Sequence, residues 1–317
     1  MHDDYRLCGW RVHSEISLPD LLPWTGDPQA PVELLIELGA VEAHLAESVH
    51  VGPIVQHSID GTCRFAIDGV AAYRIAADGR SIRIQPHLPE DFPAIRAFLF
   101  GMVFAIACQR RGLLPLHACC VRLPTPHGDV AVAFSAASGA GKSTLASAFI
   151  RRGYPILADD VTLVCAGEQG TLALPTFPRI KLWGDALERE EVRGTSRERV
   201  RRGMDKFSIG LQATDFSADE PLKLATLYHL ERVNDVQHVG QQCVMGLDAS
   251  IRFAHALYQA PALMRVATDK AAHFSLATQL AAGVADHILL RQLSGFEHLD
   301  DLVSRIVDVH ARGRVPA

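Results

Sequence analysis

The sequence predicts a mixed α/β fold with a small antiparallel β domain at its N-terminus. Two observations support this. Short runs of alternating apolar and polar residues fill the first 86 positions, and three Asp-Gly pairs separate the later runs. In the middle of the chain, an apolar run at 130–134 leads into a glycine-rich loop at 135–144 and a helical run at 145–152. Alternation predicts strands, and the order of strand, loop and helix is typical of α/β domains.

The composition favours a packed cytoplasmic protein over other classes. Of the 317 residues, 48% are hydrophobic and 21% are charged, which predicts a core rather than disorder. The net charge of −5 argues against a general nucleic-acid binder. Seven scattered cysteines without a C-x-x-C pair indicate a reducing compartment. The N-terminus has no signal character, and the most apolar stretch, 98–108, is too short to span a membrane and predicts a buried helix.

The N-terminal domain is expected to cover residues 1–90 and to have a structural or substrate-docking role. Asp-Gly is a strong hairpin signal because both residues tolerate positive φ, and the pairs lie at 60–61, 68–69 and 78–79. They predict a small antiparallel meander. The Pro-rich segment 86–93 predicts a linker. Apolar residues spaced by three and four over 94–111 predict a helix that ends at Gly112, so a connecting helix is expected at 91–112.

The central loop, SAASGAGKST, ends in the Gly-Lys-Ser-Thr pattern of a phosphate-binding loop. Its backbone N–H groups and the following helix N-terminus attract phosphate oxygens. We expect Lys142 to contact the β- and γ-phosphates and Ser143 to hold Mg²⁺. Ala136 stands where this pattern usually has its first glycine. The residues expected to bind the nucleotide are Ser138, Gly139, Ala140, Gly141, Lys142, Ser143 and Thr144.

Two apolar runs beside this loop carry polar residues. The run at 113–123 predicts a strand that contains His117, and the run at 156–164 predicts a strand that contains Asp159 and Asp160. Alternation would point the two aspartates to opposite faces. A carboxylate here could hold a metal through water, or could accept a proton from an attacking hydroxyl. The alternatives are a buried histidine with satisfied hydrogen bonds and a turn with solvated aspartates.

The region 113–317 is expected to form the second domain. Arg179 and Lys181 alternate along a strand, either as a clamp for phosphate or as solvated charges. The charged run 188–206 predicts a solvated helix or loop, whose Arg-rich half at 197–202 could close over the site. We expect a strand at 222–233, a long amphipathic helix at 271–293 that includes Ile288 and Leu289, and a last helix at 299–311. Four histidines without metal-ligand spacing are expected at the surface, namely His273, His287, His298 and His310.

The central stretch resembles the HPr kinase/phosphorylase family. Members carry a His-containing strand, a Gly-x-Ser-Gly-x-Gly-Lys-Ser loop, a helix ending in Arg-Gly and an Ala-Asp-Asp strand. The corresponding segments here are LPLHACCV, SAASGAGKST and FIRRGYPILADDVTLV, within residues 113–165. The whole layout is more similar to the shorter HPr-kinase-like proteins encoded with lasso and other ribosomal peptide pathways. Some of those proteins phosphorylate a serine of a precursor peptide.

The resemblance implies a P-loop kinase core of HPr-kinase (PEP-carboxykinase-like) type. Such an enzyme would transfer the γ-phosphate of ATP, with Mg²⁺, to a serine hydroxyl of a peptide or small protein. It implies Asp160 as the general base and Lys142 at the phosphates, with Asp159 and His117 completing the site, and Ser143 and Asp159 as metal ligands. The HPr enzymes assemble as hexamers, which makes a homo-oligomer an option. The later metal-binding Glu and the basic glycine loop of the family are missing, so we expect a kinase without efficient phosphorolysis.

Two further functions are compatible with the same loop. One is a small-molecule kinase or a carboxykinase-like activity, and the other is a nucleotide-binding switch or accessory ATPase. The base distinguishes them, because a kinase needs Asp160 aimed at an incoming hydroxyl, whereas a switch needs a positioned water and moving loops. The sequence does not identify the phosphate acceptor.

Overall fold

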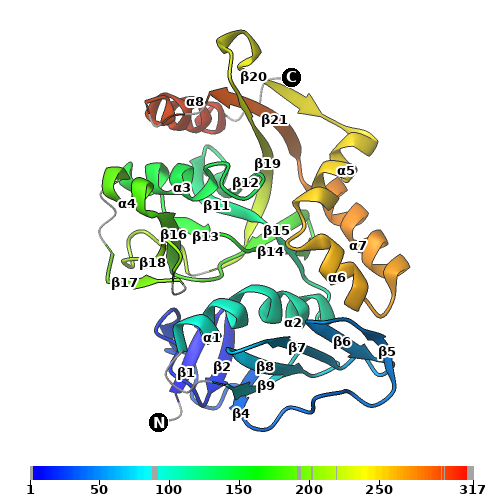
Figure 1. Cartoon of the computed structure of the whole chain (residues 1–317). Coiled ribbons are helices and arrows are strands. Elements are labelled where there is room, and N and C mark those ends of the chain that lie inside the picture. The colour runs from blue at the N-terminus through cyan, green and yellow to red at the C-terminus, as the bar shows by residue number, and fades with distance from the viewer. Residues whose placement is uncertain are drawn as a thin grey trace.

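The computed structural model describes residues 3–87, 92–190, 194–200, 203–218, 220–293, 295 and 297–312. It has a mixed α/β architecture in which two large sheets and one small sheet are combined with helices (Figure 1). The N-terminal sheet lies at one end of the molecule, and helices α1 (Phe92–Phe98) and α2 (Phe104–Arg110) lie between it and the central sheet. The α/β class predicted from the sequence is therefore confirmed.

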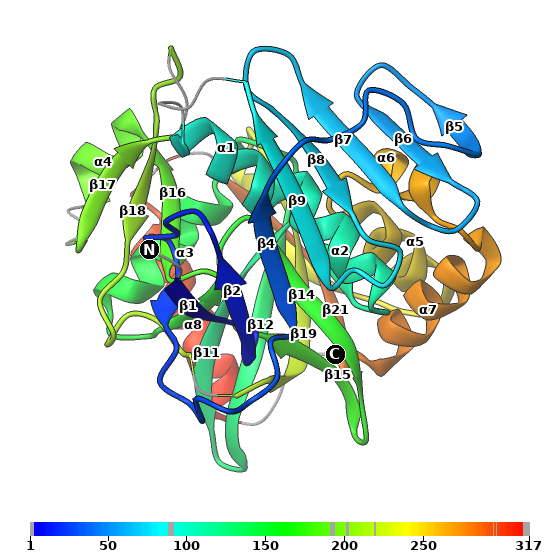
Figure 2. The same ribbon diagram turned by 90° about the horizontal axis from the view of Figure 1, so that it is seen from below.

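The N-terminal sheet is larger than predicted and is not purely antiparallel. Nine strands pair in the order β3-β1-β2-β4-β9-β8-β7-β6-β5, and the β2–β4 and β4–β9 pairs are parallel (Figure 2). The predicted antiparallel meander is present as β6–β9, but the prediction that the whole N-terminal domain is small and antiparallel was wrong, because turn residues reveal hairpins, whereas parallel neighbours are distant in sequence. The strands are β1 Asp3–Leu7, β2 Trp10–Ser14, β3 Leu22–Pro23, β4 Leu34–Leu38, β5 Ser48–Val51, β6 Val55–Ser58, β7 Cys63–Ile67, β8 Ala71–Ile75 and β9 Ser81–Pro86.

The Asp-Gly pairs do form the predicted turns between antiparallel strands. Gly61, Gly69 and Gly79 have φ of +93°, +70° and +68° and join β6 to β7, β7 to β8 and β8 to β9. These values lie where side chains with a Cβ are strained. Gly79 is also packed tightly, because a Cβ there would lie 2.2 Å from the carbonyl oxygen of Ala107 in α2. The turn at Gly69 is open, with nothing within 4 Å of such a Cβ.

Gly79→Ala is expected to destabilise the protein more than Gly69→Ala, although both turns have nearly the same φ. Both variants place a Cβ in the left-handed region, at a cost of about 1–2 kcal/mol. Gly79→Ala adds a collision with the backbone of α2, which raises the total to about 2–5 kcal/mol. Chemical denaturation of the two variants measures the difference. Equal free energies of unfolding would show that α2 does not press on this turn.

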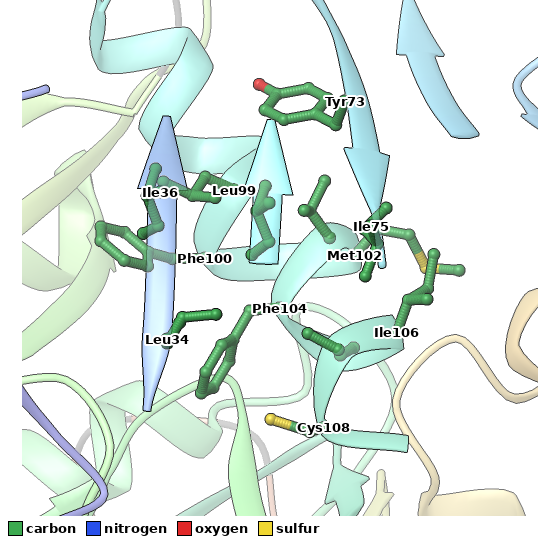
Figure 3. Packing of buried hydrophobic residues seen from close by; sticks show 14 of the residues in the cluster. Leu34, Ile36, Tyr73, Ile75, Leu99, Phe100, Met102, Phe104, Ile106 and Cys108 are labelled. Atoms are coloured by element: carbon green, nitrogen blue, oxygen red, sulfur yellow. The ribbon is translucent and has the colours of Figure 1, made fainter. Parts of the chain in front are cut away.

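The predicted helix at 94–111 is present but contains a π-helical turn at Leu99–Val103, where Gly101 has φ −106° and ψ −109°. It ends, as expected, at Gly112 with φ +73°. Its apolar face packs on the N-terminal sheet, as the buried side chains of Leu99, Phe104 and Ile106 show against those of β4 and β8 (Figure 3). Within the described residues, Pro93–Arg110 alone is long and apolar enough to cross a membrane, and 72% of it is buried inside the protein.

The predicted linker at 86–93 is only partly described. Residues 88–91 lie outside the described residues, Pro86 belongs to β9, and Pro93 belongs to α1. The predicted domain boundaries at 90 and 112 stay a prediction. Side chains from the N-terminal sheet, α1 and α2 share one apolar core with Val161, Leu163 and Phe177 of the later region.

The central sheet pairs β10-β14-β15-β19-β12-β11-β13, with β21 beside β19 and β20 beside β21. The β12–β19 and β19–β21 pairs are parallel. Its strands are β10 Leu114–Leu116, β11 Ala118–Thr125, β12 Gly128–Ser135, β13 Ile156–Ala158, β14 Thr162–Gly167, β15 Gly170–Leu174, β19 Leu222–Val233, β20 Gly240–Val244 and β21 Asp286–Leu293. The small sheet contains β16 Arg179–Trp183, β18 Lys206–Gly210 and β17 Ser196–Arg199, in this order.

Two predicted strands are each divided in the structure. The run at 113–123 becomes β10 and β11, which separate at His117, and the run at 156–164 becomes β13 and β14, which separate at the two aspartates. The two divided runs pair with each other, half by half: β10 of the first run pairs with β14 of the second, and β11 pairs with β13. The breaks place His117, Asp159 and Asp160 at strand ends, where their side chains are not confined to the faces of the sheet.

The helices of the later region surround the central sheet (Figure 1). They are α3 Lys142–Arg151, α4 Gly184–Glu190, α5 Gly246–Ala256, α6 Ala260–Val266, α7 Lys270–Gly283 and α8 Leu299–Ala311, with a short 3₁₀ turn at Val236–His238. The predicted helix at 271–293 was wrong in its second half. It ends at Gly283, and Ile288 and Leu289 belong to β21, where parallel pairing with β19 outweighs the helical spacing.

The prediction of surface histidines was wrong for three of the four. His273, His287 and His310 are 5–6% exposed, whereas His298 is exposed. His287 Nε2 donates to the carbonyl oxygen of Ala281 at 2.9 Å, and His287 Nδ1 lies 3.2 Å from His229 Nε2, which explains how the ring is accommodated inside the protein. Burial lowers the pKa of each of the three buried rings, so all are neutral at pH 7.

Candidate active site

The glycine loop joins β12 to α3, as the sequence predicted. Gly139 and Gly141 have φ of +79° and +93°, which glycine adopts without strain, and Gly141 directly precedes the first turn of α3. Ala136 is not among the residues with positive φ, so the alanine at this position requires no unusual backbone conformation. The first turn of α3 therefore opens toward the loop with unpaired N–H groups, which is the arrangement that attracts anions.

Lys142 is folded back onto the loop. Its side chain is buried, and Nζ donates to the carbonyl oxygens of Ala136 at 2.9 Å and Ala137 at 3.1 Å. Its third contact is His117 Nε2 at 3.1 Å. Burial lowers the pKa of Lys142, because the low-dielectric surroundings disfavour its charged form. The ammonium is thus held beside the glycine loop by two backbone carbonyl groups and an imidazole, and none of these three partners carries a negative charge.

His117 connects Lys142 to the acidic turn, which we define as Asp159 and Asp160. His117 Nδ1 lies 3.1 Å from the backbone carbonyl oxygen of Asp160. An ammonium can only donate, so Nε2 accepts from Lys142, and Nδ1 carries the hydrogen that Asp160 accepts. Burial, followed by the charge of Lys142, lowers the pKa of His117. The imidazole is therefore a neutral bridge between the loop and the acidic turn.

Asp159 faces the phosphate loop. Its Oδ1 accepts from Ser143 Oγ at 2.7 Å, and its Oδ2 accepts from the backbone N–H of Lys181 at 2.8 Å. The side chain is buried, and burial together with the negative charge of Asp160 raises its pKa. The serine hydroxyl and the carboxylate are hard oxygen donors of the kind that Mg²⁺ prefers. Across the described residues, no group of three or more His, Cys, Asp or Glu side chains is arranged for a metal ion.

Asp160 has a left-handed backbone with φ +70°, which is uncommon for a residue other than glycine. Its carboxylate pairs with Lys181 Nζ at 2.7 Å, and its Oδ1 lies 3.6 Å from His117 Nδ1. Burial alone would raise the pKa of Asp160, but the charge and hydrogen bond of Lys181 outweigh it and lower the pKa well below the usual range. The expectation of alternating strand positions was wrong, although the two aspartates do face different partners.

Arg179 and Lys181 on β16 are neither solvated nor free. Arg179 Nη1 donates to Asp20 Oδ1 at 2.7 Å, so its partner comes from the N-terminal region. Both cationic side chains are buried. Lys181 is the functional candidate whose role the sequence did not define. Its alternation with Arg179 was a signal, but the partner 21 positions away could be identified only in three dimensions.

The glycine loop and Asp160 line a cavity of about 260 Å³. Lys181, Lys206 and Arg232 contribute positive charge to its wall, next to His117 and Lys142. A second cavity of about 520 Å³ shares Gly141, Thr144 and Arg232 with the first. Its wall combines apolar side chains, such as Val239 and Leu299, with polar and charged ones, such as Asp301 and Arg305. A basic cavity and a cavity of mixed polarity thus meet at the glycine loop.

The Arg-rich segment is described only in part, since residues 201–202 lie outside the described residues. Arg197 and Arg199 lie on β17, with their guanidinium carbons 4.4 Å and 4.9 Å from the ring centroid of Phe207. Both guanidinium groups pack on the ring of Phe207, and neither arginine lines the cavity at the glycine loop. The closure of this segment over the site stays a prediction.

Comparisons with known proteins find solved structures that resemble this chain. No protein-family model and no curated protein matches the chain. The solved structure of the HPr(Ser) kinase/phosphatase from Coxiella burnetii matches with a TM-score of 0.34 and 13% sequence identity, over 62% of this chain and 95% of that chain. At this identity and TM-score, the likeness decides neither the activity nor the substrate of the present chain.

Proposed function

We propose that the protein is an ATP-dependent kinase with an HPr-kinase-like P-loop core, and that it transfers the γ-phosphate to a serine hydroxyl of a peptide or small protein. The observation that carries the proposal is the hydrogen-bonded series Lys142–His117–Asp160–Lys181, which joins a phosphate-type loop to an ionised carboxylate. A kinase needs a carboxylate beside the transferred phosphate to accept the proton of the acceptor hydroxyl, whereas a nucleotide switch needs a positioned water.

The residues divide the task of phosphoryl transfer among them. Lys142 and the N–H groups of the loop would bind the phosphates, and Lys206 and Arg232, which line the same cavity, would offset the phosphate charge. Ser143 and Asp159 would hold Mg²⁺, which supplies further charge neutralisation when bound. The second cavity, of about 520 Å³, shares Gly141 and Thr144 with the loop and offers room for the nucleoside.

Asp160 would accept the proton of the attacking hydroxyl. Its lowered pKa keeps it ionised, so its oxygen is available at neutral pH without prior loss of a proton. A weak base is sufficient, because phosphoryl transfer passes through a loose transition state in which the hydroxyl needs little activation. Positioning is then the main contribution, and the contacts of Asp160 with Lys181 and His117 provide it.

Radiolabelled ATP tests the proposal directly. The protein is incubated with γ-labelled ATP, Mg²⁺ and a panel of serine-containing peptides, and the label is followed on peptide, small molecules and free phosphate. We expect label on a peptide serine, which disappears when that serine is replaced by alanine. Label on a small-molecule hydroxyl would favour a small-molecule kinase. Label in free phosphate alone, at a rate unchanged by Asp160→Asn, would contradict the kinase proposal.

A further inference from the structure

A third cavity, of about 450 Å³, lies between the N-terminal sheet and the later region. We call it the apolar pocket. Its wall comes from the end of the sheet, the helix with the π-helical turn, and α6, as the neighbouring positions of β6, β7 and α6 in Figure 2 indicate. The side chains that line it are mostly apolar and include Ile54, Val55, Phe65, Phe98, Met102 and Ala262. None of these residues takes part in the candidate active site.

Tyr258 connects the apolar pocket to the active site. It lines the pocket, and its ring meets the ring of His117 edge to face at a centroid distance of 5.7 Å. Its backbone N–H donates to the carbonyl oxygen of Pro115 at 2.8 Å, which fixes it beside the strand that leads to His117. A group bound in the pocket therefore lies one aromatic ring away from the bridge between Lys142 and the acidic turn.

A second connection runs along β16. A small polar cleft lined by Arg96, Arg179 and Lys181 shares Ala97 and Val200 with the apolar pocket. The same Lys181 lines the cavity at the glycine loop. The polar cleft has a volume of only about 10 Å³, so no chain passes through it; it shows that the wall of the apolar pocket and the wall of the cavity at the glycine loop adjoin at the same cluster of side chains. An apolar side chain in the apolar pocket and a hydroxyl at Asp160 would therefore occupy adjoining parts of the protein.

We propose that the apolar pocket binds a large apolar side chain of the acceptor peptide, close in sequence to the serine that receives the phosphate. This inference rests on the proposed kinase function and specifies its substrate class. The volume falls within the range of about 300–1,000 Å³ that is common for ligand sites, and it admits a side chain such as leucine or phenylalanine. Removal of that apolar surface from water would strengthen peptide binding about tenfold to a hundredfold.

Ile54→Lys tests the pocket, and Ile59→Lys is its matched control. Ile54 lines the pocket and is 46% exposed, so a lysine can be accommodated while its charge repels an apolar group. Ile59 belongs to the same region, is 68% exposed and is absent from the pocket wall. Peptides that carry leucine or alanine at each position near a single serine are compared. Their binding is measured without ATP, by displacement of the fluorescent apolar probe N-phenyl-1-naphthylamine.

We expect leucine peptides, at one preferred spacing from the serine, to displace the probe at least tenfold more effectively than alanine peptides. Ile54→Lys should remove this difference, and Ile59→Lys should keep it. Equal displacement by both peptide sets, or the same preference in Ile54→Lys, would overturn the inference. Transfer from labelled ATP is measured separately on the same peptides, so a failure of the kinase proposal is seen as absent label and a failure of this inference as absent selectivity.

Discussion

Asp160→Asn is expected to reduce phosphoryl transfer by about two to four orders of magnitude while nucleotide affinity changes little. Asparagine cannot accept the proton of the acceptor hydroxyl, yet it fills the same space. It also tolerates the left-handed backbone at this position better than most residues, so the turn at φ +70° is retained. Initial rates of label transfer and the equilibrium binding of a non-hydrolysable ATP analogue give the two quantities.

Asp185→Asn is the matched control for this substitution. Asp185 lines the same cavity, is exposed, and is not part of the Lys142–His117–Asp160–Lys181 series. Asp160→Asn leaves Lys181 without its buried partner, so the free energy of unfolding is measured in parallel. A large loss of nucleotide affinity in Asp160→Asn would reassign the carboxylate to metal binding, and equal losses of rate in both variants would remove Asp160 from the chemistry.

Lys142→Ala is expected to abolish measurable transfer, with a loss of at least about 10²–10³ in rate and weaker nucleotide binding. The variant removes the ammonium that donates to the loop carbonyls and to His117 Nε2. Lys223→Ala, on the exposed side of β19, removes the same charge far from the loop and should retain full activity. Unchanged turnover in Lys142→Ala would mean that this loop is not the phosphate site.

The sequence predicted the parts of the fold that local patterns determine. The Asp-Gly turns, the helix before Gly112 and the strand, loop and helix around Lys142 depend on residues close together in the chain. Long-range pairing was beyond those patterns. Strand β9, a parallel neighbour of β4, is separated from it in sequence by the strands β5 to β8. Strand β21 was mistaken for helix because its apolar residues also fit a spacing of three and four.

The sequence predicted which residues form the candidate site better than it predicted which of them are hydrogen-bonded to one another. The motif placed Lys142, His117 and the two aspartates in one region, and the structure brings their side chains or backbones into contact. Their catalytic roles stay predictions. The breaks at His117 and Asp160 were not visible, because both lie within apolar runs that read as continuous strands. Lys181 needed the tertiary structure to reveal that its partner is Asp160.

Asp20, in the turn before β3, connects the N-terminal region to the candidate active site. It accepts hydrogen bonds from Arg179 at 2.7 Å and from Arg96 at 2.8 Å, and thereby fixes β16 two residues before Lys181. Phe177, just ahead of this strand, packs against Phe100 and Phe104 of the helix that covers the sheet. In evolutionary terms, the N-terminal region could not simply be exchanged for another domain. A replacement would also have to supply a partner for Arg179, because Asp20 holds the strand that carries Lys181, the partner of Asp160.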